Sequence, residues 1–278
     1  MSEDHAPPPA PPPIGAGTPL RVLRHAPEQR EMALIVGLAL FLNLAPGTLL
    51  QWLHFRWGIF LTQILFIAAP PVLAVRWFYL DRASVLPLRR PGWNAVGAAL
   101  LGAAGLNHLL NLAGAWQERI FPMPDSLRLL WERLLTPHGG VDYALLLLLL
   151  GPLPAICEEI LFRGFLQAGF VQAFESPGKG ILMTALVFAA FHLDPWRFAG
   201  VLVLGLFLGY LVHRSGSLLP AMLAHALNNI LSIVQTDPSA SGSAPGSPGS
   251  AAVAVILVLV ALALLRRSAS WTGATRVL

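Results

Sequence analysis

Long apolar stretches separated by short polar connections are the feature that most limits how this chain can fold. They lie at about 31–53, 58–79 and 93–115, onward from 140, and then at about 179–193, 197–213, 218–235 and 251–265. A helix needs roughly 20 residues to cross a bilayer, and in lipid its backbone groups must be hydrogen-bonded internally. Hydrophobic residues make up 55% of the chain and charged residues 12%. The sequence therefore predicts an all-α, polytopic membrane protein with about eight transmembrane helices.

The connections divide the chain into five parts. They are a Pro-rich tail at 1–30, an N-terminal group of transmembrane helices at 31–139 and a second group at 140–235. A linker at 236–250 and a last transmembrane helix with a basic tail at 251–278 follow. The tail has little to bury, which predicts disorder. At about 123–136 leucines recur at helical spacing, a pattern typical of an interfacial helix or a lid.

Basic residues indicate the orientation. Eight spans place both termini on one side, and the segments expected there carry 12 Arg and Lys residues against five in the other connections. This asymmetry predicts cytoplasmic termini, and the acidic start predicts no cleaved signal peptide. The preference for Arg over Lys, with abundant Ala and Pro, is typical of a GC-rich bacterium, so we expect an inner-membrane protein. The scattered basic residues argue against a nucleic-acid partner.

Two glutamates and an arginine interrupt the fourth apolar stretch, just after the break Gly151-Pro152-Leu153-Pro154. Each charge costs roughly 2.5 to 3.5 kcal/mol at the centre of a membrane helix, so such residues indicate function. Glu159 and Arg163 are four apart, which favours an intrahelical ion pair. Glu158 lies on another face and is therefore the candidate for proton chemistry. Neighbouring Cys157, the single cysteine, is expected to be a packing residue.

Two later segments carry the other candidate residues. The turn Glu175-Ser176-Pro177-Gly178 lies near the midpoint between Glu158 and His192, so an antiparallel hairpin places these two at equal depth, with Phe188 one turn before His192. His225 and Asn229 share one face of a further apolar helix. For each of these, helix packing or interhelical hydrogen bonding is the alternative interpretation.

Together these groups can activate water and stabilise an oxyanion inside the helical bundle. Glu158 is predicted to take a proton from water that His192 helps to hold, and His225 with Asn229 to donate hydrogen bonds to the tetrahedral oxyanion. Proteolysis is the simplest reaction with these parts. A non-catalytic membrane scaffold or immunity protein, and a proton-coupled transporter, are the alternatives from other classes.

The three motifs Glu158-Glu159-x-x-x-Arg163, Phe188-x-x-x-His192 and His225-x-x-x-Asn229 resemble, in order and spacing, those of the CPBP family. This family comprises CAAX prenyl proteases of the Rce1 type and bacteriocin-processing (Abi) enzymes. The resemblance covers about residues 140–235. It implies an intramembrane endopeptidase in which Glu158, His192, His225 and Asn229 are catalytic and Glu159, Arg163 and Phe188 give structural support. Residues before 140 match no motif and are expected to supply specificity or partner contacts.

The resemblance leaves the role of metal open. Glu158, His192 and His225 have the ligand types of a three-residue zinc site with water in the open position. The chain contains no HExxH motif, and we favour a metal-free, glutamate-dependent mechanism without a cofactor. The expected partners are a membrane-associated protein or peptide substrate and the lipid bilayer.

Overall fold

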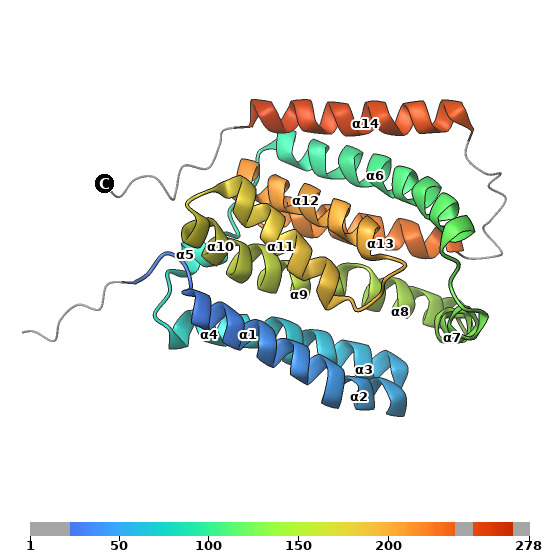
Figure 1. Ribbon diagram of the computed structural model, residues 1–278, viewed down its shortest axis with the longest axis horizontal. Coiled ribbons are helices and arrows are strands. Elements are labelled where there is room, and N and C mark those ends of the chain that lie inside the picture. The colour runs from blue at the N-terminus through green and yellow to red at the C-terminus, as the bar shows by residue number, and fades with distance from the viewer. Residues whose placement is uncertain (1–22, 237–246, 269–278) are drawn as a thin grey trace, which may run out of the picture.

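The computed structural model describes residues 23–236 and 247–268, and within these ranges every regular element is a helix (Figure 1). In chain order they are α1 (Gln29–Leu42), η1 (Asn43–Gly47), α2 (Thr48–Leu53), α3 (Phe55–Leu61), η2 (Thr62–Ala68), α4 (Ala69–Trp77), α5 (Arg82–Val85), α6 (Trp93–Ile120), α7 (Asp125–Leu135), α8 (Gly140–Leu150), α9 (Pro152–Glu159), η3 (Ile160–Leu166), α10 (Gln167–Phe174), α11 (Pro177–Phe191), α12 (Phe198–Ser215), α13 (Leu219–Thr236) and α14 (Pro248–Arg267). The three η elements are π-helical segments inside longer helices. The predicted all-α class is confirmed.

Six helices in the described ranges are long and apolar enough to cross a membrane. They are Gln29–Leu53, Phe55–Trp77, Trp93–Ile120, Gly140–Phe174, Phe198–Ser215 and Pro248–Arg267. The predicted number was about eight, and the other two predicted spans are also helical. Helix α11 has 15 residues, and α13 carries His225, Asn228 and Asn229 near its middle. These two helices are therefore shorter or more polar than the rest.

The helices pack in layers (Figure 1). Helices α14 and α6 lie along each other on one face, α1 to α4 form the opposite face, and α9 to α13 lie between them. A Cβ atom at Gly105 of α6 would lie 2.7 Å from the carbonyl oxygen of Ala254 in α14, so only glycine permits this close approach. The largest buried side chains include Phe162, Phe165 and Phe188. The middle layer therefore forms the core.

Polar side chains also join the layers. The Asn107 side chain of α6 donates to the Asn228 carbonyl at 3.1 Å and to the Ser232 hydroxyl at 2.9 Å, both in α13. Asn111, one turn further along α6, donates to Asn107 at 3.2 Å. These asparagines therefore take part in hydrogen bonding within α6 and between α6 and α13.

Helix α7 lies across one end of the bundle. It is seen end-on in Figure 1, whereas the long helices run across the view. None of its residues is buried. Arg128 pairs with Glu118 at the end of α6, and the guanidinium of Arg197 lies 5.4 Å from the Trp131 ring centre. The role that the sequence predicts for this segment, an interfacial helix or a lid, stays a prediction.

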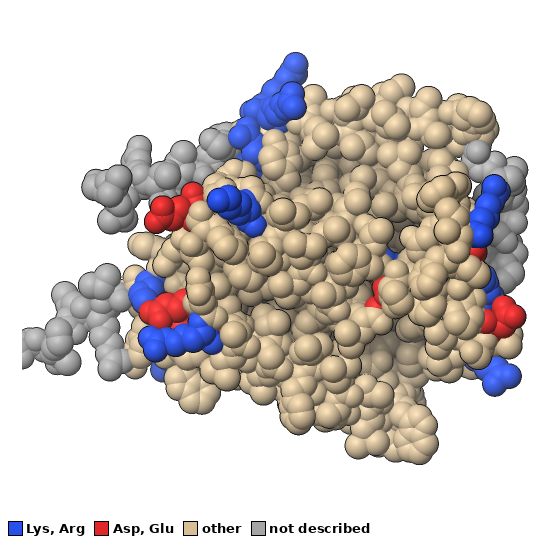
Figure 2. Space-filling view, viewed as in Figure 1, with Lys and Arg blue, Asp and Glu red and all other residues tan. Residues whose placement is uncertain are grey.

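The described chain begins and ends at the opposite end of the bundle (Figure 1). There the N–H of Arg24 donates to the Tyr79 carbonyl at 3.0 Å, and the N–H of Asp81 donates to the Arg24 carbonyl at 2.7 Å. The predicted tail 1–30 is therefore ordered from residue 23, and its remainder lies outside the described residues. The predicted linker 236–250 likewise borders helices at both ends, and 237–246 lie outside the described residues. On the face shown in Figure 2, charged side chains lie mostly at the two ends, with a broad uncharged band between them.

Candidate active site

A break in the fourth long helix fixes the start of the segment that carries the glutamates. Helix α8 ends at Leu150, Gly151 has φ −95° and ψ −95°, and α9 begins at Pro152. The Leu150 carbonyl lacks its usual helical donor because residue 154 is a proline without an N–H. Asn229 of α13 supplies a donor instead, with Nδ2 3.2 Å from the Leu150 oxygen. The predicted oxyanion donor therefore also holds this break against α13.

The predicted ion pair is present at the other end of α9. Arg163 Nη1 lies 2.8 Å from Glu159 Oε1, and both side chains are fully buried. Arg163 lies in η3, the π-helical segment that begins directly after Glu159. Segments of this kind occur often at functional sites, because the extra residue changes which way the following side chains point. The pair thus fixes α9 and η3 relative to each other.

His225 connects the two glutamates, a contact that the sequence did not indicate. Its Nδ1 lies 2.9 Å from Glu159 Oε1, and its Nε2 lies 3.9 Å from Glu158 Oε2. The carboxylate at Nδ1 makes Nδ1–H the donor, so in the neutral ring Nε2 is an acceptor. Nε2 can then donate a hydrogen bond to an oxyanion only when the ring is protonated. Glu159 is therefore shared between Arg163 and His225 and is more than an ion-pair partner.

Phe188 lies at the centre of the cationic and imidazole groups. The Arg163 guanidinium carbon lies 4.0 Å from the Phe188 ring centre, a cation–π distance. The rings of His192 and His225 are edge-on to Phe188, with centroids 4.8 and 5.8 Å away. Phe188 is buried. One aromatic side chain therefore packs against all three groups.

His192 follows the last residue of α11 and is exposed. Its Nδ1 lies 2.8 Å from the Phe188 carbonyl oxygen, so Nδ1 donates and Nε2 carries the lone pair. Among the described residues, no hydrogen bond joins His192 to Glu158 or to His225. The hairpin of α10 and α11 forms as expected, and Phe188 links His192 to the other site residues.

Gln63 is a site residue that the sequence analysis missed. It lies in η2 of the N-terminal helices, and its Nε2 donates to Glu158 Oε1 at 3.1 Å. Its own Oε1 is buried and has no hydrogen-bond partner. The available signal was a lone glutamine in an apolar span, with no motif to connect it to Glu158. Glu158 is thus held from two sides, by Gln63 and by α13.

Glu158, His192 and His225, the zinc set of the alternative interpretation, do not form a ligand cluster in the described residues. Within the described ranges, no three His, Cys, Asp or Glu side chains lie together in a way that could hold a metal ion. His225 Nε2 lies 3.9 Å from Glu158, but its Nδ1 is bound by Glu159. The arrangement suits acid–base chemistry at Glu158, with an acceptor or donor at the neighbouring Nε2.

Comparison with known proteins finds a match for the part of the chain that contains the three motifs. Residues 140–231, from α8 into α13, match the family model of Rce1-like type II CAAX prenyl endopeptidases. No curated protein and no solved structure matches the chain. The matched segment contains all three sequence motifs, and Gln63 lies outside it. The resemblance found in the motifs is therefore confirmed for this segment, which is similar to the Rce1-like type II CAAX prenyl endopeptidases.

Proposed function

We propose that the protein is an intramembrane endopeptidase that hydrolyses a peptide bond in a membrane-associated protein or peptide, with Glu158 as the general base. One observation supports this most directly. The Glu158 carboxylate lies between the Gln63 amide, at 3.1 Å, and the His225 imidazole, at 3.9 Å, in an otherwise apolar bundle. An intramembrane carboxylate is costly and therefore indicates function. With neighbours of this kind, Glu158 can take up and release a proton as a general base and acid.

In the proposed reaction, Glu158 takes a proton from water while the water oxygen bonds to the carbonyl carbon of the substrate. The carbonyl π electrons move to its oxygen and form the oxyanion. Glu158 then gives the proton to the amide nitrogen as the C–N bond breaks. His192 Nε2 accepts a hydrogen bond from the attacking water. The products are a carboxylic acid and an amine, so no further reactant is needed.

The oxyanion is proposed to be stabilised from α13. Asn229 has two N–H donors, of which one is directed to Leu150 and the other is available. His225 donates from Nε2 in its protonated form, and a buried carboxylate at Nδ1, here Glu159, is the arrangement that stabilises an imidazolium. Gln63 is proposed as a positioning residue, because its donor holds the Glu158 carboxylate and its free Oε1 is an acceptor for the water.

The test compares Glu158→Gln and His192→Ala with wild type in cleavage of membrane-associated peptides by the purified, reconstituted protein. We expect Glu158→Gln to lower the rate by about 10²- to 10⁴-fold, the usual contribution of a general base. Glu175→Gln is the matched control, because Glu175 is an exposed residue of the α10–α11 turn. Normal processing by both site variants would refute the mechanism. Comparing membrane and secreted peptides from wild-type and Glu158→Gln cells identifies the substrate.

The alternatives give different outcomes in the same experiments. A chelator that abolishes cleavage, with zinc alone restoring it, would favour the zinc-dependent version of the protease. If the protein protects cells or assembles a membrane complex, and Glu158→Gln retains that effect, the non-catalytic scaffold or immunity protein is favoured. For location, we propose a bacterial inner membrane with both termini cytoplasmic. A reporter fused to either end, active only in the cytoplasm, tests this orientation.

A further inference from the structure

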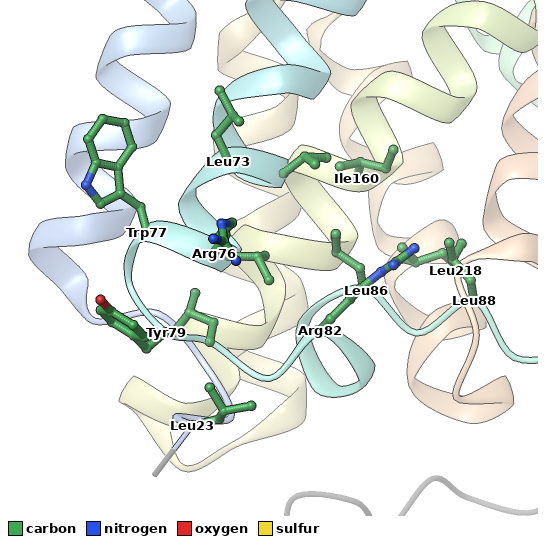
Figure 3. Close-up of a pocket in the computed structure, with 13 residues that line it drawn as sticks. Leu23, Leu73, Arg76, Trp77, Tyr79, Arg82, Leu86, Leu88, Ile160 and Leu218 are labelled. Carbon is green, nitrogen blue, oxygen red and sulfur yellow. The ribbon is translucent and has the colours of Figure 1, made fainter. Parts of the chain in front are cut away.

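A groove of about 1040 Å³ opens at the end of the bundle where the described chain begins and ends (Figure 3). Its walls come from the end of α4, the connection through α5, and two residues of the core. The end of α4 contributes Leu73, Arg76 and Trp77, and the connection contributes Arg82. The core contributes Ile160 and Leu218. The N-terminal helices and the family-matched segment therefore build it together.

Most of the groove wall is apolar and faces outward. Leu73 is 58% exposed and Trp77 is 78% exposed, although both belong to a helix long and apolar enough to cross a membrane. Such surfaces contact hydrocarbon rather than water, and tryptophan prefers the boundary between hydrocarbon and headgroups. The inner wall is closed by Ile160 and the fully buried Leu218. The groove can thus accept an acyl chain from the surrounding bilayer.

Two guanidinium groups lie at this groove without an anionic partner. Arg76 and Arg82 are exposed lining residues, and in the part of the chain that the structure describes neither guanidinium makes an ion pair or a hydrogen bond. Figure 3 shows Arg82 extending along Leu86 toward Leu218, with Arg76 on the side of Trp77. Arg24 at the same end differs, because its guanidinium binds Glu28 and Glu31. The charge of Arg76 and Arg82 is therefore available to an external anion.

We propose that this groove binds one anionic phospholipid, with the phosphate at Arg76 and Arg82 and an acyl chain along Leu73 and Ile160. Guanidinium groups match phosphate oxygens in geometry, and basic pockets between transmembrane helices bind acidic headgroups. The backbone that carries Arg82 is held in place, because Asp81 caps α5 and accepts hydrogen bonds from the N–H groups of Ala83 and Ser84 at 3.3 and 3.1 Å. Lipid in the groove supports η3 from outside, since Ile160 directly follows Glu159.

The experiment measures thermal unfolding of the full chain in a neutral detergent, titrated with phosphatidylglycerol, with phosphatidylcholine or with glycerol phosphate. A ligand that binds the folded state raises the unfolding midpoint as its concentration rises. We expect phosphatidylglycerol to raise the midpoint in a saturable way. Phosphatidylcholine, which has no net negative charge, and glycerol phosphate, which has no acyl chain, should have little effect. Equal responses to the two lipids would overturn the proposal.

Arg76→Gln/Arg82→Gln should weaken the apparent phosphatidylglycerol affinity about tenfold or more, because two charge-assisted contacts are lost. Arg89→Gln/Arg90→Gln is the matched control, since both residues are exposed and neither lines the groove. An equal loss in the two double variants would mean general surface attraction and would refute a groove site. Leu73→Trp should weaken binding by filling the groove without a change in charge, and unchanged affinity would contradict the acyl-chain position.

This inference does not depend on proteolysis. The titration uses no substrate, and we expect Glu158→Gln to bind phosphatidylglycerol as wild type does. Lost cleavage with retained lipid binding, or the reverse, separates the two proposals.

Discussion

The N-terminal helices and the family-matched segment differ in where their charged side chains lie. Within 140–231, Glu159, Arg163 and His225 are buried, and Arg163 and His225 both bind Glu159 Oε1, whereas Glu159 Oε2 and Arg163 Nε have no hydrogen-bond partner. In residues 23–139 the charged side chains lie near the surface, and a single amide, Gln63, contacts the site. Buried charges in lipid are costly unless they are paired. The matched segment therefore holds the candidate reactive groups, while the other part donates a hydrogen bond to one of them and forms most of the groove wall.

The largest expected effect is on stability in the matched segment. Arg163→Met leaves the Glu159 carboxylate buried without its guanidinium, which should cost about 3 to 5 kcal/mol of unfolding free energy. The control is Arg128→Met, because the Arg128–Glu118 pair is exposed to solvent, where an ion pair contributes little to stability. Denaturant unfolding in detergent micelles measures both. Similar losses in the two variants would remove the distinction between the two regions.

The next effect concerns the hydrogen bond that the N-terminal helices make to Glu158. Gln63→Ala removes a hydrogen bond to a carboxylate, so we expect kcat to fall about tenfold with KM nearly unchanged. Gln51→Ala, in the same group of helices, is the matched control. Steady-state cleavage kinetics and the unfolding midpoint are measured together. A purely structural Gln63 would lower the midpoint and leave kcat per folded molecule unchanged.

A smaller effect is expected at the helix break. Asn229→Ala leaves the Leu150 carbonyl without its donor and should cost about 1 kcal/mol of stability. Pro154→Ala returns an N–H to that carbonyl, so the cost of Asn229→Ala should be smaller in the Pro154→Ala background. A double-mutant cycle of unfolding free energies measures the difference. Strict additivity would mean that Asn229 does not support the break.

The smallest effect lies outside the membrane, at the connection that carries Arg82. The Ser84 hydroxyl and the N–H groups of Ala83 and Ser84 hold the pKa of Asp81 below its ordinary value of 3.8. Its charge therefore stabilises the fold above that value, and this contribution is lost as pH falls through the lower folded-state pKa. Asp81→Asn keeps a helix cap without the charge. We expect wild type to exceed Asp81→Asn by under about 1 kcal/mol at neutral pH, with the gap closing below pH 3.8 in unfolding measurements. A gap that persists or widens below that pH would contradict this.

Much of the fold could be predicted from the sequence, because hydropathy reports directly which segments prefer lipid. The amphipathic segment expected at 123–136 is α7, Asp125–Leu135. The π-helical segments are harder to predict, because the local sequence marks them weakly. Pro46 lies inside η1, but nothing local in Ile160–Leu166 distinguishes η3 from a regular helix. Such a segment is selected by packing between helices, which a local pattern does not contain.

For the candidate site, spacing within one helix was more informative than relations between helices. The four-residue spacing of Glu159 and Arg163 predicts their contact, and the structure contains it. The contacts of Glu159 with His225 and of Glu158 with Gln63 join positions 66 and 95 residues apart. The helical periodicity of a sequence does not predict contacts between residues so far apart in the chain. The catalytic roles of Glu158, His192, His225 and Asn229 stay predictions until cleavage is measured.

Helix α11 has a consequence for the supply of water. Its 15 residues extend about 22 Å, whereas the hydrocarbon core of a bilayer is roughly 30 Å thick. A helix that is too short thins the bilayer around it. His192 follows this helix and is exposed, with Asp194 two residues later. Such thinning would draw headgroups and water inward at His192, so in the proposed reaction the hydrolytic water would come from a local depression of the membrane surface.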